Sequence, residues 1–437
     1  MRASSVWRVV LGLNKTVVES IEFDEDDDPD SDGVLVARVR PTRSARSRCG
    51  LCGRRCGGYD AGGGRRRWRA LDVGTIAVFV EADARRVDCP VHGVVVAGVP
   101  WARHGAGHTH AFDATVAWLA TKCSKTAITE LMRIAWRTVG SILTRVWKEV
   151  ETRHDRLADV RRIGIDEISY KRGHKYLTVV VDHDSGHLLW AAAGRDKATL
   201  ATFFDLLGAD RCALITHVSA DGAAWIARVV AERCPTAVIC ADPFHVVRWA
   251  TDALDEVRRA AWNDARAAAR NEPRRPRGRP RQDAPDHPAA QRVTILKASR
   301  YALWKNPENL TDPQQVKLAW IARTDTRLYR AYLLKEGLRT VFQLPYQQAV
   351  EALDRWINWA RRCRIPAFVK LQKSIVKHRA SILAAIDHGL SNGRIESVNT
   401  KIRLITRVAF GFKSPDALIA LAMLSLGGHA PPLPGRT

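Results

Sequence analysis

The stretch RRIGIDEISYKRGHKYLTVVVDHDSGHLLWAAA, residues 161–193, decides the fold of the central part of this 437-residue chain. It contains three apolar runs, and an Asp-Ser-Gly turn at residues 184–186 separates the second run from the third. Runs of this length, rich in Val and Ile and bounded by turn residues, are typical of β-strands. The first run ends in the carboxylates of Asp166 and Glu167. The stretch therefore predicts three consecutive strands, with acidic side chains at the end of the first.

Helical and extended patterns alternate in the residues that follow. Helices are predicted at 197–207 and 224–232, and strands at 213–218 and 237–240, after which another helix begins. The resulting order, β-β-β-α-β-α-β-α, is that of a ribonuclease-H-like core. Strands covered by helices on both faces bring carboxylates from different strand ends to one edge of the sheet.

Three carboxylates stand where such a core could hold metal ions. Asp166 ends the first strand and Asp221 follows the fourth, and these strands are neighbours in such a sheet. A site for two ions ~3.5–4 Å apart needs a third carboxylate, and the candidate is Glu396. On a helix, four polar residues of the segment 391–403 share one face: Asn392, Glu396, Asn399 and Arg403. A single glutamate on a helix is usually a solvated charge, so the inference rests on the combination.

Two cysteine-containing pairs near the N-terminus have the spacing of zinc ligands. Cys49 and Cys52 form the first pair, and Cys89 and His92 form the second. Two such knuckles can close a tetrahedral Cys3His site, and soft thiolates favour zinc. Cys56 is a spare candidate whose spacing fits less well, and the alternative is a set of reduced surface thiols.

An arginine-rich segment lies between the two pairs. A zinc-pinned module bearing such side chains would hold DNA phosphates in a fixed geometry, although any one arginine could be a solvated surface charge. The candidates for DNA contact are Arg65, Arg66, Arg67 and Arg69.

A helix-turn-helix is predicted after this module. One helix begins at Ser124 and ends near residue 134, and a second reaches about residue 150. Apolar residues of the second helix recur at the spacing of one buried face. In a DNA-binding version, Arg137 and Thr138 would lie nearest the bases of the major groove. Many helical hairpins bind no DNA, so the basic composition of the chain contributes to this interpretation.

The overall charge points to a polyanionic partner. Lys and Arg number 69 and Asp and Glu number 46, which gives a formal charge of +23. A basic surface of this size suits nucleic acid; a basic enzyme without such a partner is the alternative. We expect no signal peptide and no membrane span, since no apolar stretch is long enough. The remaining cysteines are scattered, which favours a reducing cytoplasmic location. At the N-terminus, strand-like runs at residues 6–13 and 34–39 flank an acidic run at 22–32, interpreted as a solvated hairpin loop.

Four motifs, in order, resemble those of a known protein family. GIDE (164–167), SAD (219–221), DPFH (242–245) and SNGRIESVN (391–399) look like the motifs of DDE transposases of bacterial insertion sequences, and are closest to the ISL-three family. Two further segments resemble the same family: KASRYALWKNPENL (297–310) and AYLLKE (331–336). The resemblance covers nearly the whole chain. One departure is His92, where the family usually has cysteine.

The resemblance implies a site and a reaction. Asp166, Asp221 and Glu396 take the places of the catalytic triad, with Asp166 shared between two Mg²⁺ or Mn²⁺ ions. Asp242 and His245 match a signature that lies beside the site in related transposases. The protein would bind the terminal inverted repeats of its element and target DNA as double strands, as a homo-oligomer of at least two chains associated with the nucleoid. It would cut the DNA at each end and join the 3′-hydroxyl to target DNA. A transposase-derived regulator without catalysis and a ribonuclease-H-like repair nuclease are the alternatives.

The predicted fold class is multidomain α+β, with five segments. These are a zinc-binding module (1–110), a helix-turn-helix (111–155), the first part of the ribonuclease-H-like core (156–254), a helical insertion (255–385) and the C-terminal helices of the core with Glu396 (386–437). The insertion includes a basic loop at 271–288. Within this loop, PRGRP resembles a minor-groove hook in which Arg277 and Arg279 contact DNA; a basic loop that grips phosphates without preference is the alternative.

Overall fold

The structure of the protein, a computed structural model, describes residues 3–24, 33–271 and 288–435. Most of the acidic run, residues 25–32, and the two hook candidates Arg277 and Arg279 lie outside the described residues. The chain forms two compact units, one from residues 1–156 with 402–437 and the other from residues 157–401. Both mix helices and strands, so the predicted multidomain α+β class is confirmed.

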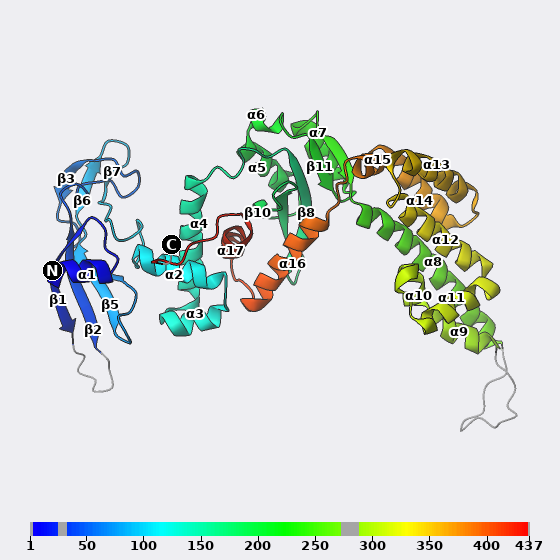
Figure 1. The fold of residues 1–437 in the computed structure, drawn as a ribbon, viewed down its shortest axis with the longest axis horizontal. Coiled ribbons are helices and arrows are strands. Elements are labelled where there is room, and N and C mark those ends of the chain that lie inside the picture. Colours follow the sequence, from blue (N-terminus) through cyan, green and yellow to red (C-terminus); the bar gives the residue numbers. More distant parts are fainter. Residues whose placement is uncertain (1–2, 25–32, 272–287, 436–437) are drawn as a thin grey trace, which may run out of the picture. The chain divides into compact units, whose positions relative to one another are not determined.

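The first unit begins with a helix packed on a four-stranded sheet whose strand order is β1-β2-β5-β4 (Figure 1). The elements are α1 (Ala3–Val10), β1 (Thr16–Asp24), β2 (Val34–Pro41), β4 (Arg65–Arg69) and β5 (Ala77–Asp83). The predicted strand at residues 6–13 is wrong, because this segment is helical over most of its length. Trp7 and Leu11 lie four residues apart, and both pack into the core of this sheet. Residues four apart share a face in a helix and in a strand, so the apolar pattern did not distinguish the two.

A smaller antiparallel sheet carries the cysteine pairs. Its strands lie in the order β3-β6-β7, with bounds β3 (Gly57–Asp60), β6 (Arg86–Cys89) and β7 (Gly93–Val96). Gly93 begins the last strand at a φ of +64°, a conformation that glycine adopts without steric cost. The tight β6–β7 hairpin therefore has the residue type it needs at the second knuckle.

Four further helices complete the first unit. They are α2 (His110–Ala120), α3 (Lys125–Met132), α4 (Trp136–Arg153) and α17 (Pro415–Leu426). The Ser124 hydroxyl caps α3 by accepting from the Ala127 N–H, and Arg133 ends that helix at a φ of +50°. The predicted helix, tight turn and second helix are confirmed here.

A buried carboxylate fixes α4 against α2. Asp113 on α2 is fully buried and accepts two hydrogen bonds of 3.0 Å from the Arg145 guanidinium on α4. Arg103 donates to the same carboxylate at 3.2 Å. Bidentate pairing of this kind satisfies both carboxylate oxygens and fixes the relative orientation of the two helices.

The C-terminal helix α17 packs on α4. A Cβ atom at Gly140 would lie 3.3 Å from the Cβ of Ala417, so the two helices approach closely there. Lys125 is buried nearby, with its ammonium 5.3 Å from the centre of the Trp136 ring and 4.0 Å from that of Phe412. Residues 402–437 thus group with the first unit, whereas the predicted division placed 386–437 with the catalytic core. The reason is that the apolar α17 packs against α4, a contact that local sequence does not reveal.

The second unit contains a five-stranded sheet of order β10-β9-β8-β11-β12. Its strands are β8 (Arg162–Lys171), β9 (Lys175–Asp182), β10 (Leu188–Ala193), β11 (His217–Ala220) and β12 (Val238–Ala241), and its helices are α5 (Lys197–Leu207), α6 (Ala209–Cys212) and α7 (Ala224–Arg233). The predicted fourth strand lies later than expected, because α6 occupies the residues before it. The expectation that the first and fourth strands are neighbours is confirmed, since β8 and β11 pair in parallel.

A block of helices follows β12 and surrounds its own apolar core (Figure 1). Its members are α8 (Pro243–Arg270), α9 (Pro288–Ala298), α10 (Arg300–Trp304), η1 (Pro307–Asn309), α11 (Asp312–Thr324), α12 (Thr326–Val341), α13 (Tyr346–Arg362), α14 (Pro366–Lys377) and α15 (Arg379–Asp387). Trp356 lies in this core and donates its indole N–H to the Leu334 carbonyl at 2.7 Å. The chain then returns to the sheet as α16 (Gly393–Val408). Within the ranges described, no helix combines the length and apolarity that a membrane span requires.

Candidate active site and zinc site

Two carboxylates lie where the parallel pairing of β8 with β11 ends: Ile165 pairs with Ala220, and the next residues along the chain are Asp166 and Asp221. The prediction that the first strand ends at Asp166 and Glu167 is wrong, because β8 continues to Lys171 by pairing with β9. Burial, and to a lesser degree the like charge of Asp221, raise the pKa of Asp166. The register of β8 and β11 thus gives Asp166 and Asp221 corresponding positions, and their shared role stays a prediction.

Asp166 is held in place by two hydrogen bonds. Its Oδ1 accepts from the Glu167 N–H at 2.7 Å, and its Oδ2 accepts from Asn399 Nδ2 at 2.7 Å. Burial is the main cause of its raised pKa. The bond to Asn399 joins the first strand of the sheet to α16, the helix that carries Glu396.

Asp242 and His245 form a linked pair at the start of α8. Asp242 is the N-cap, and its Oδ2 accepts from His245 Nδ1 at 2.6 Å. This hydrogen bond raises the pKa of His245 above its ordinary value. Burial acts to raise the pKa of Asp242, but the hydrogen bonds from His245 and from the Asn392 N–H outweigh it, so that this pKa lies below its usual value. Asp166 and Asp221 also contribute to raising the pKa of His245, so the pair lies beside the two carboxylates.

A buried hydrogen-bond chain fixes the N-terminal end of α16. The Asn392 backbone N–H donates to Asp242 Oδ1 at 3.2 Å, and the Asn392 side-chain Oδ1 accepts from the Ser219 hydroxyl at 2.6 Å. Ser219 also contacts His183 Nε2 at 2.7 Å. The side chains of His183, Ser219 and Asn392 are all buried. The sequence pointed to Asn392, and it contained Ser219 within the SAD motif without giving it a role, whereas His183 was not predicted at all.

The helix α16 also approaches β8 at Gly164. A Cβ atom at this glycine would lie 2.1 Å from Ile395 Cδ1 and 3.0 Å from His183 Nε2. Gly164 therefore allows the helix to pack against the strand that carries Asp166, and Figure 1 shows α16 beside β8.

Replacing Gly164 by Ala is expected to displace α16 and to lower stability by roughly 1–3 kcal/mol, the usual cost of overpacking a well-packed contact. The hydrogen bond from Asn399 to Asp166 should weaken with it, because α16 carries Asn399. Gly393→Ala is the matched control on α16 itself, since its Cβ would only make ordinary contact with Ser391 at 3.5 Å. Denaturant unfolding is measured on both variants; an unchanged midpoint for Gly164→Ala would contradict this packing.

Glu396 lies on α16 between the two anchored asparagines and is exposed. Asn392 and Asn399 are buried toward the sheet, whereas Arg403 is exposed. The predicted common face is therefore divided: the amides pack inward, and the charged residues lie toward solvent. Within the described residues, the three acids do not form a group whose ligand atoms all lie within 4.8 Å of one another, as the four zinc-ligand candidates do.

Glu167 is an acidic side chain at this edge that received no role in the sequence prediction. Its carboxylate pairs with Arg195, whose guanidinium lies 4.9 Å from the centre of the Tyr176 ring. Burial raises the pKa of Glu167 to about 7, and the charges of Asp221 and Asp166 contribute in the same direction. In the sequence, only its position next to Asp166 indicated that Glu167 lies near the candidate site.

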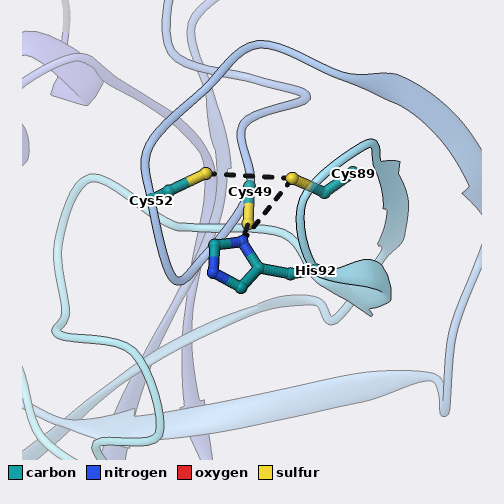
Figure 2. Close-up of side chains that lie close together, drawn as sticks. All are labelled: Cys49, Cys52, Cys89 and His92. Carbon is teal, nitrogen blue, oxygen red and sulfur yellow. Dashed lines mark hydrogen bonds between the residues drawn. The ribbon is translucent and has the colours of Figure 1, made fainter.

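The second candidate site lies at the small sheet. Cys49, Cys52, Cys89 and His92 have ligand atoms that all lie within 4.8 Å of one another, and Figure 2 shows the four side chains converging. The Cys52 and Cys89 sulfurs are 3.8 Å apart, and His92 Nδ1 lies 3.6 Å from Cys49 Sγ and 3.7 Å from Cys89 Sγ. A tetrahedral ion with bonds of about 2.3 Å to sulfur separates its ligands by close to these values. The donor set and its spacing therefore fit zinc.

The local backbone supports this set of ligands. The pKa of Cys89 is lowered to about 6, chiefly by a hydrogen bond from the Val91 N–H, and a thiolate is the form that binds metal. Cys56 lies outside the four-residue cluster and its thiol donates to the Arg54 carbonyl at 3.2 Å.

The four arginines predicted between the cysteine pairs have intramolecular partners. Arg65 and Arg67 both donate to Glu81, at 2.9 and 2.8 Å, and retain about half of their side-chain exposure. Arg66 donates to the Ala106 carbonyl at 2.7 Å. Arg69 is mostly buried and bonds the carbonyls of Ala70 and Val78, so its contacts are structural.

The predicted base-reading residues lie at the start of α4. Arg137 and Thr138 occupy its first turn, where Arg137 is exposed and Thr138 is half-buried. The buried face of the same helix contains Val139, Ile142, Leu143, Val146 and Trp147. The arrangement leaves the first turn free to reach a DNA groove.

Comparison with known proteins agrees with this arrangement. A sequence model described as a transposase of the DDE class matches residues 163–422, a helix-turn-helix domain of transposase family ISL3 matches 99–147, and a zinc finger of the transposases of IS204, IS1001, IS1096 and IS1165 matches 45–92. Together with the carboxylate edge, the helix-turn-helix and the Cys3His cluster, these matches define an insertion-sequence transposase with a structural zinc site.

Full-length relatives narrow the class to a family. The chain is 65% identical over 437 residues to the transposase for insertion sequence element IS1557 of Mycobacterium tuberculosis, covering 100% of this chain and 98% of the relative. It is 26% identical over 418 residues to the transposase for IS1001 of Bordetella parapertussis, covering 94% of this chain and 96% of that protein. The chain belongs to the ISL3 family of transposases.

Proposed function

We propose that this transposase cuts DNA at the ends of its element and transfers the freed 3′-hydroxyl to target DNA, with Asp166, Asp221 and Glu396 as its catalytic residues. The observation that carries the proposal is the bond from Asn399 to Asp166, which ties the helix of Glu396 to the edge where Asp166 and Asp221 meet. On this interpretation the five-stranded sheet is a ribonuclease-H-like core, and the helices from α8 to α15 are an insertion between β12 and α16.

The donor set of the edge suits a hard divalent cation. Carboxylate oxygens are the ligands that Mg²⁺ and Mn²⁺ prefer, and burial together with the like charge of neighbouring acids raises the pKa of Asp166. Asp166, Asp221 and Glu396 would hold the ions. When bound, these ions would activate the attacking oxygen and stabilise the leaving oxygen of a phosphodiester. Asn399 would orient Asp166, and Asp242 would orient His245 and the start of α16.

Two displacements at phosphorus account for the proposed reaction. In the first, a water oxygen attacks the phosphorus at the element end, the bond to the 3′-oxygen breaks, and that oxygen takes up a proton to leave a 3′-hydroxyl. In the second, the 3′-hydroxyl attacks a target phosphodiester and loses its proton, while the target's own 3′-oxygen leaves. Each step exchanges one P–O bond for another, so no oxidant or energy source is required.

We further propose that the helix-turn-helix reads the terminal inverted repeats and that the zinc module grips the adjacent backbone. A transposition complex that holds two element ends would contain at least two copies of the chain. Of the predicted arginines, Arg65 and Arg67 keep about half of their side-chain exposure. They could exchange their bonds to Glu81 for bonds to a DNA phosphate.

Arg137→Ala is expected to weaken binding to the cognate end by roughly 1–3 kcal/mol and binding to random duplex much less, because one good base contact carries that much discrimination. The matched control is Arg153→Ala at the opposite end of the same helix, whose exposed guanidinium pairs with Glu149. Titrations on cognate and random duplex at several salt concentrations make the comparison. Equal losses on both DNAs for Arg137→Ala would show that α4 does not read sequence.

A further inference from the structure

A pocket of about 700 Å³ lies in the helical block at the start of α8. Three aromatic side chains line it: Phe244, Trp304 and Phe342. The guanidinium of Arg248 and the carboxylate of Asp252 also line it, together with Arg339, whose charge is paired with Glu336 and Glu308. Its volume is in the range of pockets that bury a small organic ligand, roughly 300–1,000 Å³.

The aromatic side chains of the pocket are available for stacking. Phe244 is 58% exposed, so its ring is accessible from the pocket. Trp304 is held between other groups: the Arg300 guanidinium lies 4.0 Å from its ring centre, and the Tyr301 ring lies 6.4 Å away in an edge arrangement. The buried Trp304 Nε1 has no hydrogen-bond acceptor within the ranges the structure describes. This atom is itself shielded from solvent, so the part of Trp304 offered to a ligand is its half-buried ring.

The arginines of the pocket differ in how firmly they are held. Arg339 donates to Glu336 at 2.7 Å and to Glu308 at 3.1 Å, which fixes its guanidinium plane. Arg248 is exposed on α8. Aromatic faces combined with guanidiniums are the groups that hold unpaired nucleobases and the phosphates between them.

The pocket is connected to the candidate active site through one ring contact. Phe244 lies edge-on to His245, with ring centres 5.9 Å apart and an interplanar angle of 85°. His245 bonds Asp242, which follows β12 at the same sheet edge where Asp221 follows the neighbouring strand β11. A DNA strand whose scissile phosphate lies at these carboxylates would therefore have its neighbouring nucleotides within reach of Phe244.

We propose that this pocket binds unpaired bases of the DNA next to the scissile phosphate, with Phe244 as the stacking surface. The inference rests on the proposed end cleavage, because it is that reaction which places DNA at the carboxylate edge. Holding a base outside the duplex would leave the adjacent phosphate accessible to Asp166 and Asp221. The exposed guanidinium of Arg248 beside three aromatic side chains favours a nucleotide over an apolar protein segment.

The test uses the full-length protein carrying Asp166→Asn, bound to end duplexes that contain 2-aminopurine at single positions flanking the cleavage site. Because 2-aminopurine is quenched when stacked in a duplex, its fluorescence should rise severalfold at one or two flanking positions and not at internal positions. Adding Phe244→Ala or Phe244→Leu should abolish the rise and weaken binding of a single-stranded flank by roughly 10-fold, within the range of one lost base stack. Phe244→Trp should retain the binding of the single-stranded flank, since it keeps an aromatic face.

Trp359→Ala is the matched control: Trp359 is another partly exposed aromatic of the helical block, at 39% exposure, and does not line the pocket. Unchanged fluorescence at every flanking position would overturn the proposal, as would an equal loss of signal in Trp359→Ala. If Phe244→Ala changes only the sedimentation of the protein, and thus its association with other copies, the pocket contacts protein and the proposal is wrong. Wild-type protein is assayed for end cleavage in parallel. Cleavage without a fluorescence change refutes the pocket alone, whereas the absence of cleavage refutes the proposed function.

Discussion

Replacing Asp166 by Asn is expected to reduce strand cleavage at the element end by at least about 1,000-fold, while binding of that end stays within a few-fold of wild type. Losing a metal ligand removes several kcal/mol of transition-state stabilisation, and each 1.36 kcal/mol corresponds to a tenfold change in rate. The substitution keeps the side-chain shape and can preserve one of the hydrogen bonds that Asp166 makes. Asp221→Asn and Glu396→Gln are expected to behave in the same way.

The cleavage assay uses labelled end duplex with Mg²⁺ or Mn²⁺, and binding is measured on the same preparation. Asp184→Asn is the matched acidic control, because Asp184 lies in the turn between β9 and β10 and pairs with Arg162. It should cleave normally. Near-normal cleavage by any one of the three triad variants would remove that residue from the catalytic set.

Cys89→Ser is expected to lose bound zinc and to unfold the small sheet of the N-terminal module. Zinc binding to sites of this kind is worth on the order of 10 kcal/mol, and the three strands β3, β6 and β7 expose much of their surface. Without the ion, little else holds the two knuckles together. Cys49→Ser should have the same effect, and binding to the element end should weaken because the small sheet, which carries Arg86 on β6, loses its fold.

Elemental analysis of the purified protein gives the zinc content, and limited proteolysis reports the integrity of the module. Cys56→Ser is the control, since Cys56 lies outside the ligand cluster. About one zinc per chain is expected for the wild type and for this control, and none for Cys89→Ser. A zinc-free wild-type protein that binds its DNA end normally would refute the metal site.

Several features of the fold followed from local sequence patterns. The α5 helix has the predicted bounds, residues 197–207, and the parallel pairing of β8 with β11 followed from the order of strands and helices. The zinc ligands were also predictable, because each knuckle is defined by residues three positions apart. These are patterns in which the interacting residues are close in sequence or in which the element order limits the choices.

The features that the sequence did not predict depend on contacts between distant segments. Ser219 is 173 residues from Asn392, and nothing near either residue indicates the bond between them. The same is true of α17, whose apolar surface fits either unit by composition and packs on α4 through Ala417 and Gly140. The pairing of Arg65 and Arg67 with Glu81 likewise depends on the register of β4 against β5.

End-cleavage mapping tests the central proposal most directly. Purified wild-type protein is incubated with Mg²⁺ and a duplex that spans the junction between the element's terminal repeat and its flanking DNA, and the new 3′ ends are sequenced. The account predicts a break at the junction that leaves a 3′-hydroxyl on the element strand, and joining of that end to added target DNA. Stable, sequence-specific binding of the duplex without any break at the junction would contradict it.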